Sequence, residues 1–147
     1  MSPPARNPRR IEGESGQISV LVLGMVLIVL MLTAVIFGAT RVNLEARKLF
    51  STADGAATAA AASIEPGYSI QAPAASQLQA AVEEHLLVTD AHQNHYRLHV
   101  VRTWASDDGE TVHVELAAEA ELPVLRWIMP AGVPVVADSH ARVTINR

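Results

Sequence analysis

The sequence predicts a mixed α+β protein with a membrane-spanning helix at its N-terminal end. Three patterns support this prediction: an uncharged apolar stretch over residues 18–39, small and apolar side chains at helical spacing through residue 60, and an alternation of apolar and polar residues after residue 96. A helical period followed by a period of two is typical of helices that cover one face of an antiparallel sheet. We therefore expect a long helix, a small helix and a three-stranded antiparallel sheet.

Composition and charge limit the functions open to the chain. Its 147 residues include no cysteine and carry a net charge of -4. Without cysteine there are no disulfides, thiolate nucleophiles or cysteine-ligated metal centres. The charges are uneven, because residues 1–17 have a net charge of +1, residues 41–48 of +2 and residues 49–147 of -7. The acidic balance argues against a nucleic-acid partner.

The stretch Ile18–Ala39 has the length and composition of a transmembrane helix. Its 22 residues carry no charge, and a helix of that length, with Leu30 near its centre, spans a hydrocarbon core of about 30 Å. A buried helix of a soluble protein is one alternative, but so small a chain cannot cover all faces of this stretch. A cleaved secretory signal is another, but its apolar region is only about 7–15 residues long.

Basic residues on the two sides of this helix do not decide its direction. Three precede it and three follow it, namely Arg6, Arg9, Arg10, Arg41, Arg47 and Lys48. A long domain is translocated largely regardless of its flanking charges, so the short N-terminal stretch is expected to stay in the cytoplasm. We expect a single-pass plasma-membrane protein with a cytoplasmic stretch (1–17), a transmembrane helix (18–39), an extramembrane Ala-rich helix (40–65) and an extracytoplasmic α+β domain (66–147).

The helical pattern continues beyond the membrane segment. Small and apolar residues recur at alternating spacings of four and three and share one helix face: Val35, Ala39, Val42, Ala46, Leu49, Ala53, Ala56 and Ala60. Proline is absent between Pro8 and Pro66, so one helix is expected over Ile18–Ala62. The face of small residues, like the pair Ala34 and Gly38, would let another helix approach closely. Two interpretations stay open: the face contacts partner helices, or it packs on the protein's own sheet.

The C-terminal portion combines a short helix with three strands. A helix is expected over Ala74–Leu87, with one apolar face formed by Leu78, Ala81, Val82 and Leu86. In the first strand, one face is expected to hold Tyr96, Leu98, Val100, Arg102 and Trp104. After a turn at Ser106–Gly109, the second strand alternates from Val112 to Leu122, and a linker, Pro123–Pro134, precedes a third strand with Val135, Ala137, Ser139, Ala141, Val143 and Ile145 on one face.

The residues that carry chemistry form no convincing catalytic set. His92, His95 and His99 are spaced closely enough to raise the question of a zinc site, but they do not fall on one helix face. Glutamates of the second strand, Glu115, Glu119 and Glu121, are expected on its solvated face, and Glu83 and Glu84 diverge on their helix. Trp104 and Trp127 are expected as core or interfacial anchors. We therefore predict no enzyme activity, no cofactor and no resident metal.

Part of the sequence resembles a known family. The resemblance lies in Gly16-Gln17-Ile18-Ser19-Val20-Leu21, the apolar span, the basic Arg41–Leu49 stretch and the element Ala53-Asp54-Gly55-Ala56-Ala57. Together these residues resemble the N-terminal module of TadE/TadG-like Flp pilus-assembly proteins, over about residues 15–62. The resemblance implies a pilin-like, membrane-anchored component of a Flp (tight adherence) pilus or a related secretion system. It also implies membrane lipid and other assembly proteins as partners, with a helix-mediated oligomer as a further expectation.

One difference from related pilins concerns processing. Those pilins are cut after a glycine that is followed five residues later by a glutamate, but Leu21 lies at that distance from Gly16, and Ile18 at that distance from Gly13. The resemblance is therefore closer to the membrane-retained TadG-like type, and we expect the N-terminus to be kept. A second hypothesis of another class is a membrane-anchored extracytoplasmic sensor whose domain binds a small ligand or metal through His92, His95 and His99.

Overall fold

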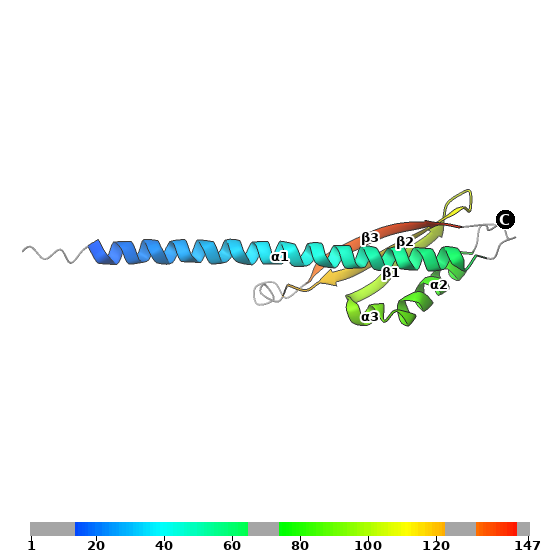
Figure 1. Cartoon of the computed structure of the whole chain (residues 1–147), viewed down its shortest axis with the longest axis horizontal. Coiled ribbons are helices and arrows are strands. Elements are labelled where there is room, and N and C mark those ends of the chain that lie inside the picture. Colours follow the sequence, from blue (N-terminus) through cyan, green and yellow to red (C-terminus); the bar gives the residue numbers. More distant parts are fainter. Residues whose placement is uncertain (1–13, 65–73, 123–131, 144–147) are drawn as a thin grey trace, which may run out of the picture. The chain divides into compact units, whose positions relative to one another are not determined.

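The computed structural model describes residues 14–64, 74–122 and 132–143 (Figure 1). Three helices and three strands follow one another in these ranges: α1 (Glu14–Ala62), α2 (Ala75–Val88), α3 (Ala91–Asn94), β1 (Tyr96–Ala105), β2 (Thr111–Ala120) and β3 (Val133–Arg142). The chain divides into two compact units, residues 1–37 and residues 38–147. The predicted mixed α+β class is confirmed, while the single-turn helix α3 was not predicted.

Helix α1 contributes to both units. It has 49 residues, begins four residues before the expected start at Ile18 and ends at Ala62 as expected. No proline interrupts this range and its second half is rich in alanine, which has the highest helix propensity. In the first unit, the described residues all belong to α1.

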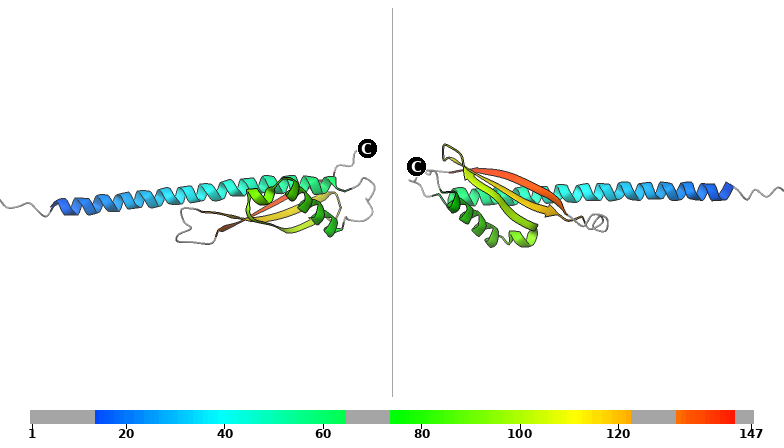
Figure 2. Two further views of the ribbon diagram at one scale, coloured as in Figure 1. Left: turned by 90° about the horizontal axis from the view of Figure 1, so that it is seen from below. Right: turned by 180° about the vertical axis from the view of Figure 1, so that it is seen from behind.

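The second unit contains an antiparallel sheet in the order β1-β2-β3 (Figures 1 and 2). The turn predicted at Ser106–Gly109 joins β1 to β2, and Gly109 adopts a φ of 69°, which glycine tolerates without steric cost. The Asp108 carboxylate accepts hydrogen bonds from the Ser106 hydroxyl and the Glu110 amide. Those two hydrogen bonds, the Ser106 one first, lower the pKa of Asp108 below its usual value.

One hydrophobic core lies between the helices and one face of this sheet. Both α1 and α2 contribute to it, as do alternate residues of the strands, and its largest fully buried side chains are Leu49, Val82, Leu78, Leu86, Val112, Val114 and Leu116. The predicted alternation is confirmed over Val112–Leu116 in β2 and over Val135–Ser139 in β3. Ala117, which was expected on the solvated face of β2, is buried as well. Trp127 and Ile145 lie outside the described residues.

Strand β3 begins two residues earlier than predicted, at Val133. Pro134 therefore lies inside the strand, opposite Glu119 of β2. Proline lacks an amide proton, but β3 is an edge strand in the described sheet, where such a residue is tolerated.

Strand β1 differs from the expected alternation. Val100 pairs with Leu116 and Arg102 with Glu115, so β1 advances two residues where β2 advances one. Because of this β-bulge, the residues of β1 after Val100 point to the opposite face of the sheet from the one that a regular alternation would give them. The prediction that Arg102 and Trp104 share a face with Leu98 and Val100 was therefore wrong, because they lie opposite Glu115 and His113, which alternate with the buried residues of β2. A second register shift, between Tyr96 and His99, likewise places Tyr96 opposite Glu119 on that outer face, so the prediction was wrong for Tyr96 as well.

Candidate functional site

The N-terminal part of α1 is the most unusual surface of the described chain. Its large apolar side chains between Ile18 and Phe37 are 49–72% exposed, and Leu30 at the centre is 60% exposed. Ala39, the last residue of the predicted span, is also exposed. An exposed apolar surface this extensive marks contact with a membrane or another protein, because water does not solvate it favourably. This helix is a candidate membrane anchor by its length and composition.

The face of small residues on α1 packs largely within the second unit. Leu49, Ala53, Ala56 and Ala60 are fully buried, and Val42 and Ala46 pack at the edge of the same core. Of the two interpretations left open by the sequence, packing on the protein's own sheet describes the four buried positions, since a buried side chain has no surface left for a second molecule. Ala34 and Gly38 lie outside this core, and their contact with a partner helix stays a prediction.

The element Ala53–Ala57 has a specific packing role in the second unit. Ala53, Ala56 and Ala57 are core residues, whereas Gly55 lies against α2. A Cβ atom at Gly55 would lie 3.0 Å from Nε2 of His85, so a larger residue there would force the two helices or the imidazole ring to move. The small residues thus permit close contact of α1 with α2 and the sheet.

Asp54 adds a polar contact to this packing. The hydroxyl of Ser139, a buried residue of β3, donates a hydrogen bond to Asp54 Oδ1 over 3.2 Å. This contact supplies a partner for a buried hydroxyl, which would otherwise be costly to bury. The sequence contained the element Ala53–Ala57 as a resemblance, but its pairing with Ser139 could be found only in the folded chain.

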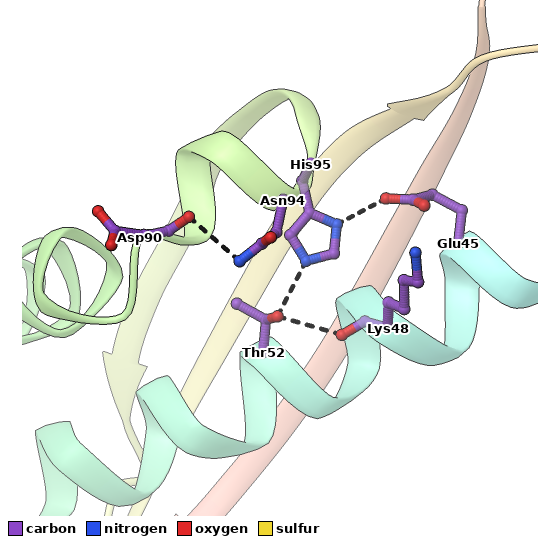
Figure 3. Close-up of polar contacts among 6 residues, drawn as sticks. All are labelled: Glu45, Lys48, Thr52, Asp90, Asn94 and His95. Atoms are coloured by element: carbon purple, nitrogen blue, oxygen red, sulfur yellow. Dashed lines mark hydrogen bonds and ion pairs between the residues drawn. The ribbon is translucent and has the colours of Figure 1, made fainter.

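His95 connects the segment after α3 to α1 (Figure 3). Its Nδ1 atom lies 2.6 Å from Oε1 of Glu45, and its Nε2 atom lies 3.0 Å from Oγ1 of Thr52. The Thr52 hydroxyl donates to the carbonyl oxygen of Lys48 over 3.1 Å. Both ring nitrogens of His95 thus face oxygen atoms of α1 side chains. The buried His95 therefore serves as a polar bridge between segments 50 positions apart.

The other two histidines of the proposed ligand set do not form a metal site with His95. His92 is exposed on α3, and the exposed His99 directs Nδ1 to the carbonyl oxygen of Arg97, 3.0 Å away. Within residues 14–64, 74–122 and 132–143, no three metal-ligating side chains come together in a way that could hold an ion. The structure thus does not assemble the alternative site from His92, His95 and His99.

The outer face of the sheet carries a row of aromatic and charged side chains that was not expected. The Trp104 and His113 rings stack with centroids 4.9 Å apart, and His113 lies 5.6 Å from His140 of β3. The guanidinium carbon of Arg102 lies 4.2 Å from the centre of the Trp104 ring, a cation–π contact. The β1 bulge creates this row, because it places Arg102 and Trp104 on the outer face.

The acidic side chains of β2 lie on this same outer face, as predicted, but two of them are paired. Glu115 Oε2 lies 2.6 Å from Nε of Arg102, and Glu119 Oε1 lies 3.0 Å from Nη1 of Arg97. Glu121 is exposed beyond the end of the strand. These carboxylates therefore contribute to exposed cross-strand ion pairs, each of which typically stabilises a fold by less than about 1 kcal/mol.

Helix α1 thus carries a candidate membrane anchor in its N-terminal part and contributes core residues to the second unit in its C-terminal part. Residues 16–63 match the family model for TadE/G-like Flp pilus assembly. The match includes the apolar segment and Ala53–Ala57, and it does not separate a TadG-like from a TadE-like type. No curated protein and no solved structure gives a significant match to the chain.

Proposed function

We propose that this chain is a non-enzymatic, membrane-anchored component of a Flp/Tad-type pilus assembly or a related secretion system. The family match over residues 16–63 carries the proposal. It includes the whole exposed apolar segment as well as the element Ala53–Ala57, whose residues pack the helix against its own domain. Within Ala53–Ala57, the alanines and Gly55 have packing roles and Asp54 accepts a hydrogen bond from Ser139.

The anchor and its direction form the second part of the proposal. Residues 18–39 cross the plasma membrane, the stretch before them stays in the cytoplasm, and the second unit lies outside. The length of the apolar helix and the exposure of its side chains support the membrane location. The ability of long domains to cross regardless of flanking charge supports the direction.

Contact with other assembly proteins forms the third part. Among the small residues singled out on α1, Ala34 and Gly38 are not part of the core of the second unit. Their spacing of four places them on one helix face, where small side chains allow a second transmembrane helix to approach closely. We assign this pair the role of a helix contact within the membrane, with another assembly protein or a second copy as the partner.

Isolation of the protein from membranes with its neighbours tests this function. Full-length protein extracted in a mild detergent should carry other pilus-assembly or secretion-system membrane proteins, identified by mass spectrometry. The double substitution Ala34→Leu, Gly38→Leu should reduce that recovery. Thr33→Leu serves as a matched control, because Thr33 lies on a different helix face and its hydroxyl donates to the Val29 carbonyl oxygen of its own helix. Recovery of no such proteins with the unaltered chain would contradict the proposal.

A further inference from the structure

An open cavity of about 340 Å³ lies in the second unit, where α1 meets the segment around α3 and the end of β2. The residues that matter here are Arg41, Glu45 and Lys48 of α1, together with His95, Glu119 and Glu121. The lining is thus rich in charged groups of both signs. Its chemistry depends on which of these groups already have partners.

Two of the three carboxylates in this cavity have partners within the chain, and the third, Glu121, is exposed at its edge. Glu45 contacts His95, and Glu119 pairs with Arg97. Arg41 and Lys48, by contrast, form no ion pair with any residue that the structure describes. Figure 3 shows Lys48 beside the Glu45–His95 contact. Two cations that pair with no described carboxylate thus line the cavity together with one unpaired carboxylate, Glu121, which leaves an excess of one positive charge for an anion.

The position of these cations along α1 specifies the source of the anion. Arg41 is two residues beyond Ala39, the end of the apolar segment, which is about 3 Å along a helix. The headgroup layer on each side of a bilayer is roughly 5–7 Å thick, so Arg41 lies at its level when residues 18–39 span the hydrocarbon core. Lys48 is two helical turns further on the same face, and its long flexible stem lets the ammonium group reach back.

We propose that this cavity binds the phosphate group of a membrane phospholipid through Arg41 and Lys48. The inference rests on the proposed membrane anchoring. A phosphate held there would form charge-assisted hydrogen bonds with both side chains, which are stronger than bonds between neutral groups. The lipid would thereby attach the second unit at the point where α1 leaves the bilayer. Free inorganic phosphate has the same chemistry, and the test separates the two sources.

Lipid binding by the full-length protein in a nonionic detergent tests this assignment. Native mass spectrometry with added phosphatidylglycerol should show a retained lipid on the unaltered chain. The double substitution Arg41→Gln, Lys48→Gln should weaken that binding about tenfold or more, because two charge-assisted bonds are lost. Arg47→Gln is the matched control, since Arg47 is an exposed cation of the same helix that does not line the cavity. It should leave lipid binding within about twofold of the unaltered protein.

Three results would contradict the proposed lipid site, and a control for unfolding accompanies them. Equal losses from Arg47→Gln and from the double substitution would show a general attraction of basic residues to anionic lipid. Displacement of the lipid by inorganic phosphate at comparable concentration would show a site for the free ion. Thermal melts of each variant by circular dichroism identify any loss of lipid that follows from unfolding. A chain that inserts into membranes but retains no lipid contradicts this inference alone, whereas a chain that fails to insert contradicts the proposed function.

Discussion

The imidazole of His95 lies between two side chains of α1, with Nδ1 placed 2.6 Å from Oε1 of Glu45. The side chain of His95 is 3% exposed and that of Glu45 is 17% exposed, so the contact is largely shielded from water. A charge-assisted hydrogen bond in such surroundings fixes where the segment after α3 sits on the helix. We therefore expect the stability of the second unit to depend on it.

The first prediction concerns this contact. Glu45→Gln should lower the free energy of unfolding of the second unit by about 1–3 kcal/mol, because it replaces a charged acceptor beside a buried imidazole. Chemical denaturation of the full-length protein in detergent, followed by tryptophan fluorescence, measures the change. Glu84→Gln, at an exposed position of α2, should change stability by less than about 0.5 kcal/mol. Equal effects of the two substitutions would show that the His95 contact contributes nothing.

The second prediction concerns the buried face of α1. Ala56→Leu should destabilise the second unit, typically by 1–3 kcal/mol, because Ala56 is fully buried and the core has no room for added atoms. Ala62→Leu makes the same change at an exposed position and should have little effect. Denaturation curves of the two variants decide the matter. If Ala56→Leu left stability unchanged and abolished a crosslink to a partner protein, the face would be an assembly surface.

The third prediction concerns the N-terminus. The protein extracted from membranes should keep the residues before Gln17, because Leu21 and Ile18 stand where a prepilin peptidase requires a glutamate after Gly16 and Gly13. Intact-mass measurement gives the answer directly. A mass that corresponds to a chain beginning at Gln17 would place the protein among processed minor pilins.

The fourth prediction concerns membrane insertion. Leu30→Arg should impair insertion of the apolar segment, since a central arginine costs roughly 2.5–3.5 kcal/mol on insertion scales. The fraction of protein that resists alkaline extraction from membranes measures the effect. Leu30→Ile, which keeps the side chain apolar, is the control. Equal resistance of both variants would mean that this stretch does not cross the lipid core.

The elements that carry a clear period were predictable from the sequence, and the faces of β1 were not. The spacing of apolar residues by three and four predicted the buried face of α2. The alternation in β2 predicted that Val112 and Val114 lie on the buried face and Glu115 on the other. In β1, the adjacent Val100 and Val101 are chemically equivalent, so the side-chain pattern cannot show which of them lies at a bulge. The outer row of Arg102 and Trp104 could not be predicted for the same reason.

The candidate site was predictable only in part. The apolar segment is evident from its length, whereas alanines suit a partner helix and the protein's own sheet equally well, because small size is the only property either contact requires. Ala53 and Ala56 are buried in the core of the second unit, a property that depends on distant strands. Glu45 and Thr52 stand seven residues apart on one helix face, a signal that became meaningful only with His95 beside them.

Site-directed labelling tests the central claim, that residues 18–39 cross the membrane and the second unit lies outside. The chain has no cysteine, so single substitutions report without background. Ser76→Cys, at an exposed position of α2, should react with a membrane-impermeant maleimide in intact spheroplasts. Ser2→Cys should react only after lysis. Labelling of Ser2→Cys alone in intact spheroplasts, or of both variants, would contradict the proposed anchoring and its direction.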